Sequence, residues 1–255
     1  MAREFNGSTQ YLEHGAPVIT AVPATFAAWF RPNTSSGTHA ILCSGGDNAG
    51  QAYEFGIVQV NAQFWAFAQD SGFNQALAAV TLAGGTLYHG CGVFVSNTSR
   101  HAYINGGNKG SDNASRTPTA GFFQRTRIGR RANNSNAQFF DGLVAEAALW
   151  NAALSDEEVL YLAQGFSPLL LRSRLNNLVA YWPLLAASGG DEPDMAWGNK
   201  YSMSLVAAPT GVAHPPLFRP TFFDPALLGL FSGPGPGPSF QPRPGASMLS
   251  GVPMV

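Results

Sequence analysis

One acidic side chain, Glu146, lies inside the apolar segment L-V-A-E-A-A-L-W, where it could serve as a catalytic carboxylate. Hydrolysis of a glycosidic bond needs two carboxyl groups, one as the acid and the other as nucleophile or base. Residues two positions apart in a strand share a face, and here those neighbours are Val144 and Ala148. A single carboxylate cannot fill both roles. We therefore expect no enzyme activity, and interpret Glu146 as a buried structural acid that bonds backbone or an arginine.

The sequence contains none of the usual metal, nucleophile or phosphate motifs. Its five histidines and two cysteines lack the spacing of zinc ligands, and it has no G-x-S-x-G elbow and no P-loop. We expect no cofactor, with calcium as the one candidate ion. Asp47 and Asn48 in G-G-D-N could donate oxygen ligands, but they are also ordinary turn residues, which is the interpretation we favour. Cys43 and Cys91 lie in apolar runs and are expected to be buried free thiols.

Aromatic side chains are the candidates for contacting a sugar. Tyr53, Trp65 and Trp197 could form a glycan platform, with Phe73 and Tyr88 as further candidates. The alternative is that the tryptophans fill the core, as large rings usually do.

The densest basic run is Q-R-T-R-I-G-R-R, which holds Arg125, Arg127, Arg130 and Arg131. It could form a patch for phosphate or an acidic glycan. We favour a strand whose outward positions are arginine and whose aliphatic stems cover apolar neighbours.

The composition indicates the elements that must position these residues. Of the 255 residues, 45% are hydrophobic and 11% charged, with 29 glycines and 18 prolines, which fits many short strands joined by tight turns better than a helical bundle. A net charge of −1 argues against a nucleic-acid partner, and no apolar run is long enough to span a membrane. A surface so poor in charge is easier to explain if partners cover it, so we expect protein subunits as partners, including a homo-oligomer.

Periodicity and turn residues predict an all-β chain with one short helix. Ser155 begins a capping box with Glu158, and Gly165 fits a left-handed helix stop. The run N-G-G at 105–107 predicts a tight turn, whereas G-G-D-N-A-G at 45–50 is expected to be a loop. The main strands are predicted at residues 10–14, 26–31, 40–44, 52–60, 64–69, 92–96, 100–104, 125–129 and 139–150.

Several segments together resemble the laminin-G-like, concanavalin A-like jelly-roll family. The stretch F-D-G-L-V-A-E-A-A-L-W-N-A-A-L-S-D-E-E-V (140–159) is similar to that family's late strand and short helix. F-N-G-S-T-Q-Y-L-E, F-A-A-W-F-R-P, L-Y-H-G-C-G-V-F and Y-I-N-G agree with earlier strands, so the resemblance covers roughly residues 4–166. It implies a concanavalin A-like jelly-roll β-sandwich. L-V-A-Y-W-P-L (178–184), with a weak strand near 202–206, resembles a segment that many relatives carry first, so the module looks circularly permuted.

The end of the chain differs in composition from the rest. We predict a jelly-roll sandwich over residues 1–213 and a Pro/Gly-rich extended arm over residues 214–255. The apolar side chains of the arm are its candidate partner-binding residues: Phe218, Phe222, Phe223, Leu227, Leu228 and Phe231.

Two functions remain open. The first hypothesis is a bacteriophage virion component, either a capsid decoration (cement) or a tail-associated protein, that docks on neighbouring subunits through the arm. It is motivated by the arm, the charge-poor surface and an opening M-A-R-E-F-N-G without an apolar leader. The alternative is a carbohydrate-binding lectin or adhesin, because jelly rolls serve capsids and lectins alike. Localisation in a virion is expected for the first, and at the cell surface or outside the cell by a non-classical route for the second.

Overall fold

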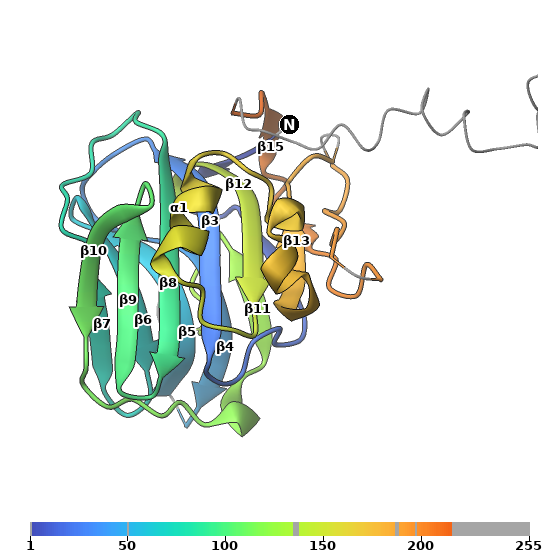
Figure 1. The fold of residues 1–255 in the computed structure, drawn as a ribbon. Coiled ribbons are helices and arrows are strands. Elements are labelled where there is room, and N and C mark those ends of the chain that lie inside the picture. The colour runs from blue at the N-terminus through green and yellow to red at the C-terminus, as the bar shows by residue number, and fades with distance from the viewer. Residues whose placement is uncertain (1, 50, 135–137, 187–188, 197, 216–255) are drawn as a thin grey trace, which may run out of the picture. The chain divides into compact units, whose positions relative to one another are not determined.

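The computed structural model describes residues 2–49, 51–134, 138–186, 189–196 and 198–215. Two antiparallel sheets stack face to face (Figure 1), which confirms the predicted β-sandwich. The first sheet has the order β10-β9-β8-β3-β12-β1-β15. The strand β13 pairs with the C-terminal half of β12, beyond the part that pairs with β1. Its strands are β10 (Gly107–Asp112), β9 (Ser99–Ile104), β8 (Tyr88–Ser96), β3 (Ala24–Pro32), β12 (Asp141–Trp150), β1 (Ala2–Asn6), β15 (Thr210–Val212) and β13 (Leu178–Trp182).

The second sheet has the order β14-β2-β11-β4-β5-β6-β7. Its strands are β14 (Ser204–Val206), β2 (Tyr11–His14), β11 (Arg125–Ile128), β4 (Thr38–Asn48), β5 (Gln51–Val60), β6 (Gln63–Gln69) and β7 (Phe73–Leu77).

The core lies between the sheets because apolar residues alternate along each strand. On β3, Phe26 and Phe30 point inward and are fully buried. The ring of Phe30 stacks on Phe64 of the opposite sheet at 5.7 Å. Burying a side chain of this size contributes about 2–3 kcal/mol, so the two inner faces hold the layers together.

Helix α1 (Asp156–Ala163) lies on the outer face of the first sheet (Figure 1). Its start is the predicted capping box, with Ser155 accepting from the Glu158 N–H and the Glu158 side chain accepting from the Ser155 N–H. Gly165 has φ +92°, which confirms the left-handed stop. Val159 and Leu162 anchor the helix on the sheet. Three short 3₁₀ segments complete the helical structure: η1 (Ala120–Phe122), η2 (Pro168–Leu170) and η3 (Arg172–Asn177).

The run G-G-D-N is wrong as a loop, because it continues β4 and pairs with the start of β5. A Cβ on Gly45 would lie 2.4 Å from the Tyr53 carbonyl oxygen, and one on Gly46 would lie 2.3 Å from the Phe122 carbonyl oxygen. The glycines are therefore needed because other backbone segments, β5 at Gly45 and η1 at Gly46, approach them closely, and not for a turn. The N-G-G turn is confirmed: Asn105 and Gly106 have φ of +52° and +74° between β9 and β10.

Some of the residues predicted to bind partners or glycans lie where the structure does not describe the chain. Phe218, Phe222, Phe223, Leu227, Leu228 and Phe231 of the arm, and Trp197, lie outside the described residues. The division at residue 213 stays a prediction. Within the described part of the chain, no helix is both long and apolar enough to cross a membrane.

Candidate functional site

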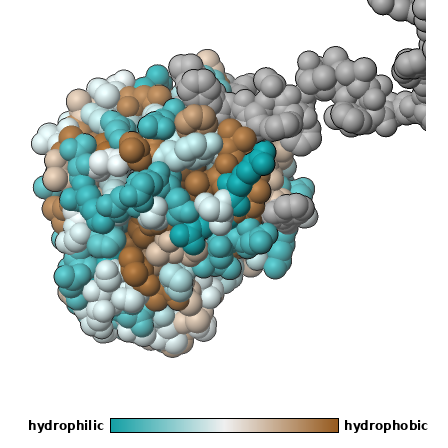
Figure 2. Space-filling model, in the orientation of Figure 1, coloured by the Kyte–Doolittle hydropathy of each residue, from teal (hydrophilic) through white to brown (hydrophobic). Residues whose placement is uncertain are grey.

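The two outer faces of the sandwich differ in what covers them. Helix α1 lies on the first sheet, and on that side hydrophobic side chains form several separate areas among hydrophilic ones (Figure 2). The outer face of the second sheet carries a groove of about 360 Å³, and an apolar hollow of about 350 Å³, lined by Leu169, Leu175, Met195, Ala196 and Gly198, lies on the side of the first sheet. The volume of the groove lies within the usual range of small-ligand sites, about 300–1,000 Å³. The groove is lined by Thr38, Val58, Val60, Trp65, Gln69, Phe73, Arg131 and Gln138.

Strand alternation forms the floor of the groove. On β6, Phe64, Ala66 and Ala68 point into the core, so the residues between them point outward. The outward Phe67 stacks on Phe73 of β7, with ring centroids 5.2 Å apart and planes 17° apart. Trp65 lies 6.1 Å from the same Phe73 ring and is half-buried. Two neighbouring rings, Trp65 and Phe73, are thus available to an apolar ligand surface.

Arg131 forms the polar wall beside these rings. Its guanidinium lies 4.2 Å from the centroid of Phe67. Its Nε donates to Glu54 at 2.7 Å, and its two Nη atoms donate to the side-chain oxygens of Gln138 at 3.0 Å and Gln69 at 2.5 Å. Arg131 thereby joins β5 and β6 to the segment after β11 at one end of the groove.

Glu54 is the buried counterpart of that arginine. Its side chain is fully buried and also accepts from the Asn133 amide at 2.7 Å and from the Ala132 N–H. A buried carboxylate is stable only when charged and hydrogen-bonding partners replace its lost water, and Arg131 with these two donors supplies them.

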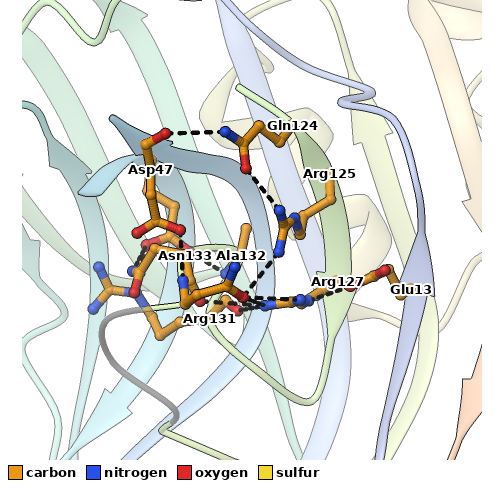
Figure 3. Close-up of polar contacts among 10 residues, drawn as sticks. Glu13, Asp47, Gln124, Arg125, Arg127, Arg131, Ala132 and Asn133 are labelled. Carbon is orange, nitrogen blue, oxygen red and sulfur yellow. Dashed lines mark hydrogen bonds and ion pairs between the residues drawn. The ribbon is translucent and has the colours of Figure 1, made fainter. Parts of the chain in front are cut away.

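Two other arginines of the basic run, Arg125 and Arg127, lie on β11 of the same sheet (Figure 3). Arg127 pairs with Glu13 at 2.6 Å and donates to the Arg131 carbonyl oxygen. Arg125 donates to the side-chain oxygen of Gln124 at 2.7 Å. Arg130 lies over the Tyr11 ring at 5.1 Å. This is the arrangement expected of outward arginines whose stems cover apolar neighbours.

The calcium candidates do not gather other acids around them. The carboxylate of Asp47 accepts from the Asn134 N–H at 2.7 Å, and its carbonyl oxygen accepts from Gln124 at 3.0 Å (Figure 3). Asn48 is exposed at the end of β4. Among the described residues, no three His, Cys, Asp or Glu side chains lie close enough to hold a metal ion.

The predicted glycan platform is not a single surface. Trp65 lines the groove. Tyr53 packs against the core between the sheets, with its ring 4.6 Å from Phe122. Sequence reasoning missed the roles of Gln69, Arg131 and Gln138. The alternation of β6 could have indicated Gln69, but no sequence signal pairs Arg131 with Glu54.

Glu146 lies on the other sheet, where β12 has an irregular register. It is buried, with φ +52°. It accepts from the Tyr181 hydroxyl, and its carboxylate lies 2.9 Å from His214 Nε2. The expectation that it is a buried acid is confirmed, and the contacts described here come from a tyrosine and a histidine. Tyrosine and histidine hold it because β13 and the segment after β15 reach this point of the first sheet.

The two cysteines are free and buried, as expected. Cys43 lies on the outer side of the second sheet, and Cys91 lies beneath α1. Burial raises the pKa of both thiols above the usual value, so neither is a ready nucleophile.

Comparison with known proteins points to one family and one kind of fold. The laminin-G-type model of the concanavalin A-like lectin/glucanases superfamily matches residues 6–160. A search of curated proteins finds no match.

Three solved structures share the fold. Domain 4 of an arabinanase from Geobacillus stearothermophilus, in complex with arabinotriose, has a TM-score of 0.52 at 20% identity, covering 64% of this chain and 76% of that one. A candidate carbohydrate-binding protein from Bacteroides ovatus has a TM-score of 0.55 at 16% identity, covering 83% and 60%. The CBM40 module of a Ruminococcus gnavus sialidase, bound to α2,3 sialyllactose, has a TM-score of 0.51 at 13% identity, covering 64% and 98%. At these identities the likeness is one of fold.

Proposed function

Since the chain belongs to the concanavalin A-like lectin/glucanases superfamily, we propose that it is a non-catalytic module that binds a glycan in the groove of its second sheet. One observation carries the proposal: the half-buried rings of Trp65 and Phe73 lie beside the polar wall of Arg131, Gln69 and Gln138 in the same groove. Sugar rings have apolar C–H faces and hydroxyl edges. A site with aromatic rings on one side and amides on the other matches both.

The surroundings of Glu146 support a module without catalytic activity. A glycosidase needs two carboxyl groups on either side of the bond that it cleaves. Glu146 is buried and lines a small cavity with Phe166 and Pro168, and its oxygens contact Tyr181 and His214. A saccharide in the groove of the second sheet would lie on the other outer face of the sandwich.

Replacement of the central ring tests the proposal. In Trp65→Ala, a glycan identified on an array should bind at least about tenfold more weakly, because aromatic anchors commonly contribute more than 1 kcal/mol. Titration calorimetry measures this change. Trp29→Ala is the matched control, since Trp29 is also half-buried but lies on the first sheet. Equal affinity in wild type and Trp65→Ala would place the ligand elsewhere.

The virion hypothesis remains a prediction. It rests on the arm at residues 214–255, of which the structure describes only His214 and Pro215. Removing residues 216–255 would abolish self-association or capsid attachment if the arm is the docking segment, and would leave both unchanged if it is not. Light scattering of the full-length and shortened chains measures the difference.

A further inference from the structure

The charge of the groove is already balanced. Among its lining residues within the described chain, Arg131 alone carries a charge. Its Nε lies 2.7 Å from the Glu54 carboxylate, and both side chains are almost fully buried. A guanidinium that pairs with a buried carboxylate at this distance presents no net charge to a ligand.

The nearby arginines are arranged in a similar way. Arg127 lies 2.6 Å from Glu13. Arg116, in the segment after β10, lies 3.7 Å from Asp70 at the β6–β7 turn. Arg125 and Arg130 lack a carboxylate partner among the described contacts, and neither lines the groove. The groove itself is therefore close to neutral.

Arg131 also fixes the direction of two amides. A guanidinium can only donate hydrogen bonds, so the amide groups of Gln69 and Gln138 must turn their oxygens toward it. Each NH₂ group then points away from Arg131. The polar wall offers amide donors to a ligand, and these suit hydroxyl and ring oxygens.

We propose that the groove selects neutral saccharides over acidic ones, because Glu54 already neutralises the arginine that a sugar carboxylate would need. This inference rests on the proposed glycan-binding function. An acidic sugar would lose water from its carboxylate on entering the groove and would find two amides in return, which do not replace a cation. A neutral sugar loses nothing comparable.

Matched pairs of glycans test the selectivity with the full-length protein. The pairs are lactose against sialyllactose, and galactotriose against trigalacturonic acid, measured by calorimetry at 50 mM and 500 mM NaCl. In a pair that binds, we expect the neutral glycan to bind at least about tenfold more tightly than its acidic counterpart. Its affinity should depend little on the salt concentration. Tighter, salt-sensitive binding of the acidic member overturns the selectivity and leaves the glycan-binding function intact. If a broad array of neutral and acidic glycans gives no binding at all, both fail.

Glu54→Gln tests the cause. It keeps the size of the side chain but leaves the charge of Arg131 unbalanced, so the preference for the neutral sugar should fall by about tenfold or more. Glu13→Gln is the matched control, because it frees the charge of Arg127 outside the groove and should leave the preference unchanged. An unchanged preference in folded Glu54→Gln overturns the role of Glu54. If that variant does not fold, the salt dependence of glycan binding to the wild-type protein still tests whether the groove is neutral.

Discussion

His89 is a titratable side chain buried in the first sheet, where it lines a small cavity with Trp29 and Glu146. It is 2% exposed on β8, its ring lies 5.4 Å from Trp29, and its Nδ1 has no hydrogen-bond partner among the described residues. Burial lowers the pKa of His89 to about 3. The folded protein therefore keeps this imidazole neutral at pH values where the unfolded chain binds a proton.

This difference predicts acid sensitivity. Below pH 6.5 the unfolded state takes up a proton on His89 that the folded state excludes down to about pH 3, so His89 lowers the free energy of unfolding by about 2 kcal/mol between pH 7 and pH 5. His89→Leu should remove that part of the pH dependence. Urea denaturation of both proteins at pH 7, 6 and 5 measures it. Parallel losses of stability in the two proteins would show that His89 is accessible to protons.

At the scale of single residues, the sequence predicts faces better than partners. The alternation F-W-A-F-A-Q places Trp65 and Phe67 on one side of β6, and the structure confirms it. The pairing of Arg131 with Glu54 joins residues 77 positions apart, and no local pattern encodes it. Glu146 is an intermediate case, because its burial follows from its apolar neighbours but its contacts come from Tyr181 and His214.

Among the helices and strands, α1 is the element whose start is specified most clearly by its local sequence. Ser155 closes its first turn by accepting from the Glu158 N–H at 3.3 Å. Ser155→Ala should lower the free energy of unfolding by about 1 kcal/mol, because it leaves a helix N–H without its side-chain acceptor. Thermal and urea denaturation measure the loss. Ser8→Ala, in the exposed turn after β1, removes the same atom outside a helix and should change little; an equal loss in both variants would remove the cap as the cause.

Strands were predictable where apolar residues alternate, and missed where glycine and polar residues replace them. The strand β10, G-N-K-G-S-D, has low intrinsic strand preference and forms because β9 offers it an edge. Its Gly110 packs against β7: a Cβ there would lie only 1.4 Å from the Leu77 carbonyl oxygen. Such strands depend on tertiary contact, which a local pattern does not contain.

For the whole molecule, the segment after the family match completes both sheets. The match ends at residue 160, but β13 pairs with β12, β14 with β2, and β15 with β1. The strands at 178–184 and near 202–206 were predicted with the family resemblance, whereas β15 was not predicted. The sandwich described here therefore extends beyond the segment that carries the family pattern.

Arg3 and Glu192 join the two ends of this sandwich. Both side chains are fully buried, with Arg3 Nε 2.5 Å from Glu192. Arg3 also donates to the carbonyl oxygens of Gly190 at 2.8 Å and Pro209 at 3.2 Å. The first strand is thus held to the segment between β13 and β15 through one guanidinium.

A double-mutant cycle tests this link. Arg3→Met or Glu192→Leu alone should lower the free energy of unfolding by about 3–5 kcal/mol, because each leaves a buried charge without its partner. The double variant should lose much less than the sum, since no unpaired charge remains. The control is the half-exposed pair of Arg31 on β3 with Glu4, which lies next to Arg3 on β1, with an expected coupling below about 1 kcal/mol. Additive losses for Arg3 and Glu192 would mean that the two ends are held together by sheet pairing alone.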